Sequence, residues 1–118
     1  MASNVVHFEI MGPDGPALRD FYGELFDWSF QTMEGMDYGL VNPSEGEPGV
    51  GGGVGTNPAG QPLVTVYVTI DDDPQAYLDR VVAMGGGVVM PPTKGPGDIT
   101  FALFSDPQGN VVGVVKGA

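Results

Sequence analysis

The feature that most limits how this chain can fold is an internal repeat at an offset of about sixty residues. Segment 6–8 (VHF) aligns with segment 66–68 (VYV), and a stretch with helical periodicity follows each of them. Each copy predicts the order β-α-β-β-β, and one copy alone cannot bury its sheet. We therefore expect a single domain over residues 1–118, with one module at 4–56 and a second at 62–117.

Both predicted helices have local signals at their ends. Residues 16–28 carry apolar side chains three and four positions apart, which is typical of an amphipathic helix, and Pro16 suits its first turn. In the second copy Asp73 can cap a helix, Pro74 suits its first position and Gly85 can end it. Apolar and β-branched runs between turn residues predict strands at 5–10, 28–33, 37–42, 50–55, 63–70, 87–92, 98–105 and 111–115.

Alternation along the first strand of each module assigns its side chains to two faces. We expect the apolar faces to pack on the helices and the polar faces to line a cleft. The apolar faces comprise Val6, Phe8 and Ile10 in one module and Val64, Val66, Val68 and Ile70 in the other. The polar faces comprise His7 and Glu9 in one module and Thr65, Tyr67 and Thr69 in the other.

Charge and cysteine content narrow the range of partners. The chain has 15 acidic and 4 basic residues, a net charge of −11, which opposes binding to nucleic acid or an anionic membrane. The same charge favours a cationic ligand, although an acidic surface also keeps a small protein soluble. Cysteine is absent, and neither a bilayer-spanning apolar run nor a signal peptide is evident. We expect a cytoplasmic protein.

The combination of "FYGELFxW" in residues 21–28 with "DPxGNxxG" in residues 106–113 resembles the vicinal oxygen chelate superfamily. That superfamily includes glyoxalase I, bleomycin-resistance proteins and extradiol dioxygenases, and the resemblance covers residues 4–116. It is greatest for small glyoxalase-like members. The resemblance implies an α+β fold in which two βαβββ modules pair into an open, barrel-like mixed sheet, with the helices outside and a central cleft.

The resemblance also implies four metal-ligand positions, on the first and last strand of each module. His7 is the only conventional ligand among them, since the others fall on Tyr67, Gly113 and the run Gly51–Gly53. A catalytic metal usually needs about three protein ligands. We therefore expect no metal cofactor, with a divalent ion held weakly by His7 and Glu9 as the alternative. The glycine run lacks the helix that follows a phosphate-binding loop, so we interpret its glycines as allowing close backbone approach or open space in the cavity.

His7, the only histidine, has three candidate roles. It could bind a ligand, it could form a structural hydrogen bond with Tyr67 or Glu9, or it could act as a general base whose pKa a neighbouring carboxylate raises. Aromatic residues such as Tyr38 and Phe101 could form pocket walls. The predicted ligand-binding residues are His7, Glu9, Tyr38, Thr65, Tyr67, Thr69 and Phe101.

These observations predict a metal-independent protein that binds a small cationic or aromatic molecule in the central cleft, as bleomycin-resistance proteins do. The alternative is a metal-dependent lyase, isomerase or dioxygenase of the same superfamily with an atypical metal site. A third hypothesis is an assembly role. The expected partners are a small-molecule ligand and a second copy in a homodimer, with no nucleic acid and no membrane.

Overall fold

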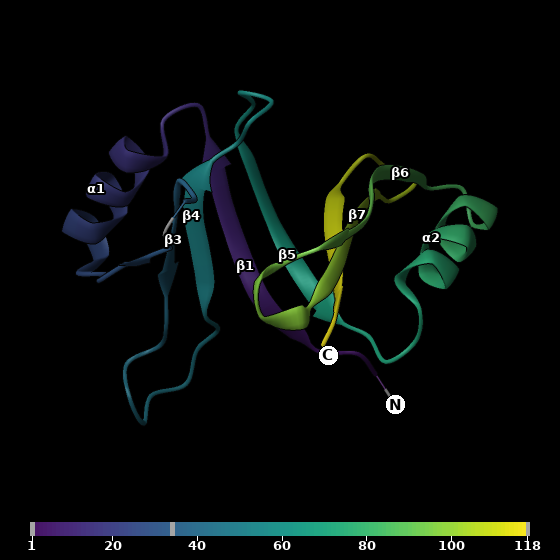
Figure 1. Ribbon diagram of the computed structural model, residues 1–118, viewed down its shortest axis with the longest axis horizontal. Helices are drawn as coiled ribbons and strands as arrows, with labels where there is room; N and C mark the ends of the chain where they lie inside the picture. The colour runs from purple at the N-terminus through teal and green to yellow at the C-terminus, as the bar shows by residue number, and fades with distance from the viewer. Residues whose placement is uncertain (1, 34, 118) are drawn as a thin grey trace. The chain divides into compact units, whose positions relative to one another are not determined.

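The structure, a computed structural model, describes residues 2–33 and 35–117. The chain forms two compact units (Figure 1). We call them the N-terminal unit (His7–Val64) and the C-terminal unit (Thr65–Ala118, with the residues before His7). The elements run β1 (Val5–Gly12), α1 (Gly15–Phe26), β2 (Gln31–Thr32), β3 (Tyr38–Val41), β4 (Gly52–Thr56), β5 (Leu63–Thr69), α2 (Pro74–Ala83), β6 (Gly87–Lys94), a short 3-10 turn (Pro96–Asp98), β7 (Thr100–Ser105) and β8 (Val111–Lys116). The predicted α+β class, with βαβββ occurring twice, is confirmed.

In the N-terminal unit the glycine-rich strand β4 is central. It pairs in parallel with β1, where Phe8 lies opposite Gly52, and antiparallel with β3, whose other edge carries β2. Helix α1 lies beside β4 (Figure 1). The Asp14 side chain caps this helix by accepting a hydrogen bond from the amide of Ala17 at 3.0 Å, and Asp27 ends it in a left-handed conformation.

In the C-terminal unit β5 pairs in parallel with β8, and β7 joins β8 to β6 through antiparallel pairing. Asp73 caps α2 as predicted, because its side chain accepts from the amide of Gln75 at 3.1 Å. Gly85, just beyond the helix, has φ +95°, which suits its predicted role as a helix end. The buried core of this unit comprises Ile70, Leu78, Ala102 and Val114.

Two predictions from the sequence are wrong, one about the length of a strand and one about which side chains a helix covers. The strand expected at 28–33 is limited to β2, and Trp28, which lies outside it, packs in an aromatic cluster with Phe8 and Tyr22. The valines of β5 do not form a helix-facing surface: Val64 is 71% exposed and Val66 is 38% exposed. Helix α2 lies against β6, β7 and β8, and it packs on Ile70, just beyond the end of β5. The first half of β5 therefore lacks the helical cover that the alternation pattern assumed.

Candidate functional site

His7, Tyr38 and Glu9 form a hydrogen-bonded chain on one face of the N-terminal unit. His7 and Glu9 lie two residues apart on β1, so their side chains share a face. The Nε2 atom of His7 lies 2.8 Å from the Tyr38 hydroxyl, which in turn donates to Oε2 of Glu9 at 2.9 Å. All three side chains are half-buried. The hydroxyl of Tyr38 thus links the only imidazole of the chain to a carboxylate.

Glycine at position 53 makes this contact possible. Tyr38 begins β3, which is separated from β1 by β4, so its ring must cross the middle strand to reach His7 and Glu9. Gly53 lies opposite Glu9, and a Cβ atom at Gly53 would overlap the ring and hydroxyl of Tyr38. Gly53 therefore makes room for a side chain, the Tyr38 ring, whereas the expectation from the sequence was close backbone approach or open space in the cavity.

Donation from Tyr38 to Glu9 places a proton on Nε2 of His7. Tyr38 has one hydroxyl proton, and that proton is donated to Glu9. Its oxygen therefore accepts from Nε2–H of His7. A neutral imidazole with its single proton on Nε2 is sufficient for this hydrogen bond. Burial lowers the pKa of His7 below 6.5, because desolvation disfavours the charged imidazolium. This desolvation acts against the rise in the pKa of His7 that the general-base role includes, and that role stays a prediction.

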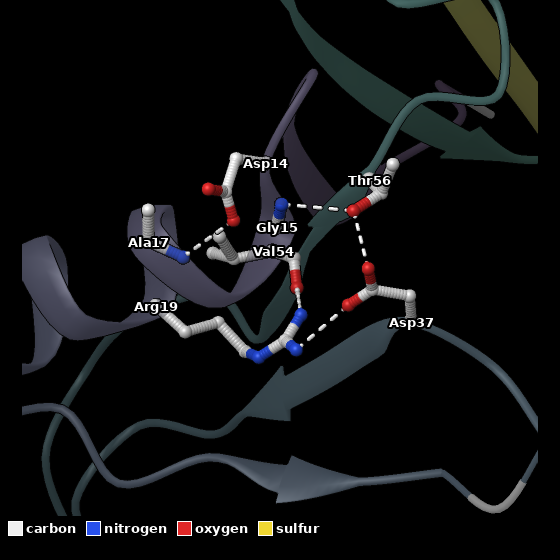
Figure 2. Close-up of polar contacts among 7 residues, drawn as sticks. All are labelled: Asp14, Gly15, Ala17, Arg19, Asp37, Val54 and Thr56. Atoms are coloured by element: carbon white, nitrogen blue, oxygen red, sulfur yellow. Dashed lines mark hydrogen bonds and ion pairs between the residues drawn. The ribbon is translucent and has the colours of Figure 1, made fainter.

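A second polar network holds the residue that precedes Tyr38 (Figure 2). Asp37 accepts hydrogen bonds from Arg19 at 2.8 Å and from the Thr56 hydroxyl at 2.5 Å. The same hydroxyl accepts from the amide of Gly15 at 2.8 Å, and Arg19 also donates to the carbonyl of Val54 at 3.0 Å. We call this network the Asp37 latch, because it joins the start of β3 to α1 and to the end of β4.

The Asp37 latch also affects the ionisation of Asp37. The hydrogen bond from Thr56 and then that from Arg19 lower the pKa of Asp37, because both favour the carboxylate form. Arg19 is well shielded from solvent, with 14% of its side chain exposed, whereas 45% of the Asp37 side chain is exposed. The ionised latch therefore fixes the backbone immediately before Tyr38 at neutral pH.

The other predicted site residues, Thr65, Tyr67, Thr69 and Phe101, belong to the C-terminal unit. The Thr65 hydroxyl donates to the carbonyl of Val111 at 2.6 Å, and Thr65 is 3% exposed, so this contact stabilises the pairing of strands. Tyr67 and Phe101 pack edge to face with ring centroids 6.2 Å apart. The backbone of Thr69 donates to Asn4 at 2.9 Å. Their membership of one site with His7 stays a prediction.

The described side chains near the expected ligand positions do not form a metal site of the family type. The described residues contain no group of three or more His, Cys, Asp or Glu side chains that could hold a metal ion. Nε2 of His7 faces the Tyr38 hydroxyl, and at the ligand position Gly113 a Cβ atom would overlap the Tyr67 ring. In the first module, β4 runs parallel to β1 and Gly52 lies opposite Phe8. The residue of β4 beside His7 is therefore Gly51, which has no side-chain donor. The donor set thus does not fit a three-ligand metal centre.

The sequence did not predict that Tyr38 joins His7 to Glu9 through hydrogen bonds, and it did not predict the Asp37 latch. Tyr38 was predicted only as a pocket wall, because its position over Gly53 depends on strand order. The glycine run was the one usable signal, since glycine in a strand often marks close approach of another group. Arg19, the only basic residue in residues 7–64, could also have indicated a specific acidic partner.

Comparison with known proteins identifies the family. The family model for the Glyoxalase/Bleomycin resistance protein/Dioxygenase superfamily matches residues 4–114, so the chain belongs to this superfamily. Solved structures of low sequence identity share the fold. A methylmalonyl-CoA epimerase from Streptomyces coelicolor is 14% identical with a TM-score of 0.65, covering 100% of this chain and 96% of that one. A Mn(II)-bound glyoxalase from Novosphingobium aromaticivorans is 17% identical with a TM-score of 0.66, covering 96% of this chain and 37% of that one.

A curated relative is similar over most of this chain. The anthracycline biosynthesis protein DnrV of Streptomyces peucetius is 27% identical over 94% of this chain and 48% of its own length. The chain therefore spans about half the length of this relative. Separately, within the described residues, no helix is long and apolar enough to cross a membrane.

Proposed function

We propose that this chain binds a small cationic or aromatic molecule through His7, Tyr38 and Glu9, without a metal of the family type. The observation that carries the proposal is the chain of hydrogen bonds from imidazole to hydroxyl to carboxylate on one half-buried face. Few polar groups on an otherwise apolar surface are what orients a small ligand in most binding sites. The net charge of −11 raises the local concentration of a cation.

Each of the three side chains has a role in this proposal. The Glu9 carboxylate supplies the negative charge that attracts a cationic or donor group of the ligand. Tyr38 holds that carboxylate in place and offers its ring as an apolar surface. Neutral His7 presents an aromatic ring of its own, whose centroid lies 6.5 Å from that of Tyr38.

The test is a titration that follows the resonances of the single histidine. Three probes suit it: bleomycin, named in the family description, an anthracycline and methylmalonyl-CoA. We expect at least one of the first two probes to shift the His7 signals and to release or take up heat in calorimetry. Glu9→Gln is expected to weaken binding of a cationic probe by about 10- to 100-fold, as loss of a charged hydrogen bond does. Glu24→Gln, on the exposed surface of α1, is the matched control. If neither bleomycin nor the anthracycline shifts His7, the proposal is wrong.

A second candidate function is metal-dependent catalysis. The fold likeness to a Mn(II)-bound glyoxalase favours it. The metal would then bind at the weak ion site predicted at His7 and Glu9. Elemental analysis after dialysis against Mn(II) or Zn(II) separates the two candidates. One bound metal per chain that is lost in His7→Ala would favour the enzyme, whereas metal content below stoichiometry and unchanged in that variant would exclude this site.

The proposal includes a homodimer as the assembled state. Large apolar side chains are exposed on both helices, including Phe21 and Leu25 on α1, which are 58% and 57% exposed, and Val82 on α2, which is 56% exposed. Exposed apolar side chains of this kind often mark an interaction surface. Size-exclusion chromatography with light scattering is expected to give twice the chain mass of 12.3 kDa, and a monomer mass would contradict the dimer.

A further inference from the structure

The N-terminal unit contains a pocket that the candidate site does not use. Its volume is about 190 Å³, below the roughly 300–1,000 Å³ of sites for drug-sized ligands, so it suits a small chemical group. The lining is mainly aromatic, proline and aliphatic side chains, with one amide. It comprises Phe8, Trp28, Val41, Asn42, Pro43, Pro48, Gly49 and Val50.

This pocket lies on the opposite face of the sheet from His7, Tyr38 and Glu9. Adjacent residues of a strand face opposite sides. A Cβ atom on Gly52 would meet the ring of Phe8, whereas a Cβ atom on the next residue, Gly53, would meet the ring of Tyr38. Phe8 packs on Trp28 with ring centroids 5.6 Å apart, on the Gly52 side. The pocket is therefore separate from the site proposed above.

The chemistry of the lining and the charge around it select one kind of occupant. Residues 7–64 contain nine acidic residues and one basic residue, Arg19, which is paired with Asp37. Glu45 and Glu47 lie on the exposed loop between the two lining prolines. A cation is favoured by this charge and by the two aromatic residues of the lining, Phe8 and Trp28. A primary ammonium would need several hydrogen-bond acceptors, and the only polar side chain in the lining is that of Asn42.

We infer that this pocket binds a quaternary ammonium group, such as the trimethylammonium end of a small molecule. Such a group carries a positive charge but no N–H donor, so an apolar and aromatic lining satisfies it without hydrogen bonds. The ammonium methyl groups pack against the prolines and valines, while the charge is attracted by the rings of Phe8 and Trp28 and by the acidic surroundings.

The single tryptophan of the chain makes the inference directly testable. Choline is titrated at constant ionic strength while Trp28 fluorescence and its indole N–H resonance are followed. The matched probe is 3,3-dimethylbutan-1-ol, which has the same shape without the charge. We expect choline to change both Trp28 signals with saturation, and the neutral probe to bind about 2- to 30-fold more weakly, the range of a cation–π contribution.

Two variants with the same charge change show where choline binds. Val50→Lys places a cation at a lining residue that is 46% exposed, so it leaves the core unchanged. It is expected to weaken choline binding tenfold or more. Val89→Lys makes the same change on β6 in the C-terminal unit, at a residue that is 50% exposed, and is expected to have less than a threefold effect.

The outcomes distinguish this pocket from the site at His7. Equal binding of the two probes, an unaltered response in Val50→Lys, or no saturable Trp28 change would each overturn the inference. A choline-dependent shift of His7 without a change at Trp28 would also overturn it, and would leave the proposed function standing. A response at Trp28 alone supports the pocket as an independent site.

Discussion

At the scale of single residues, the state of His7 decides the chemistry of the candidate site. Strand alternation is enough to predict from sequence that His7 and Glu9 share a face. The bridging position of Tyr38 could not be predicted, because it depends on which strands are neighbours and on the crossing of Gly53. The desolvation that lowers the pKa of His7 could not be predicted for a related reason: burial is a property of the folded chain.

The lowered pKa of His7 predicts how stability varies with pH. Because the pKa in the folded state lies below 6.5, the unfolded chain binds this proton more readily. The contribution of His7 to the free energy of unfolding is therefore fully present above pH 6.5, and it is lost as the pH falls through the folded pKa. Urea unfolding at several pH values is expected to show this loss in the wild type and not in His7→Gln. A wild-type stability that rises relative to the variant on acidification would contradict the assignment.

Removing the Tyr38 hydroxyl should cost stability. Tyr38→Phe keeps the ring over Gly53 but leaves half-buried Glu9 without this donor. We expect a loss of about 1–3 kcal/mol in the free energy of unfolding, the usual cost of an unmatched buried polar group. Tyr22→Phe, in the aromatic cluster beside Trp28, is the matched control. Equal losses in the two variants would show that the hydroxyl of Tyr38 has no special role.

At the scale of elements, β4 and the Asp37 latch together place Tyr38. Element types were predictable because the helices have clear caps and the strands have β-branched runs. The helix-facing surface assigned to Val64 and Val66 was not predictable, since alternation identifies two faces but does not say which neighbour covers each. The role of Gly53 in β4 likewise depends on its neighbouring strand β3, which supplies Tyr38.

A side chain on β4 should displace Tyr38. In Gly53→Ala the new methyl group overlaps the Tyr38 ring and hydroxyl, so the ring must move. Overpacking of this kind typically lowers the free energy of unfolding by about 1–3 kcal/mol. The displacement of the Tyr38 ring should also change the chemical shifts of His7. The matched control is Gly117→Ala, where a Cβ atom meets nothing within 4 Å. Unchanged His7 resonances in Gly53→Ala would contradict the crossing of β4 by Tyr38.

The Asp37 latch predicts an acid-dependent loss of stability. The pKa of Asp37 is lowered in the folded state, so its contribution is present above the unfolded value of 3.8 and is lost as the pH falls through the folded value. Asp37→Asn should therefore be less stable than the wild type at pH 7, with the difference shrinking toward pH 3. Asp20→Asn, on the exposed surface of α1, makes the same charge change and is the control. A constant difference at all pH values would show that ionisation of Asp37 is unimportant.

At the scale of the whole molecule, the internal repeat and the charge were the most informative properties of the sequence. The repeat predicted both βαβββ copies, because the same order of apolar periods occurs twice. The charge of −11 does not determine the fold, but it should govern which ligands approach. The polar contacts inside each copy could not be predicted in this way, since they differ between the copies: His7 pairs with Tyr38, whereas Tyr67 packs on Phe101.

The charge predicts a clear salt dependence. The affinity for a cationic probe that binds, bleomycin or the anthracycline, should fall about threefold or more between 0.01 and 0.15 M salt, because the Debye length shrinks from about 30 to about 8 Å. Calorimetry at the two ionic strengths measures this, with an uncharged aromatic ligand as the control. An affinity for this probe that does not change with salt would remove the electrostatic part of the proposed function.

The most direct test of the central claim is the protonation of His7 itself. Nitrogen-15 spectra of the single histidine at pH 7 distinguish the two neutral tautomers from the imidazolium. If His7 donates to Tyr38 and Tyr38 donates to Glu9, the spectra will show a neutral ring protonated at Nε2. A neutral ring protonated only at Nδ1 would contradict the hydrogen-bonded chain on which the proposed function depends, and an imidazolium would contradict the lowered pKa of His7.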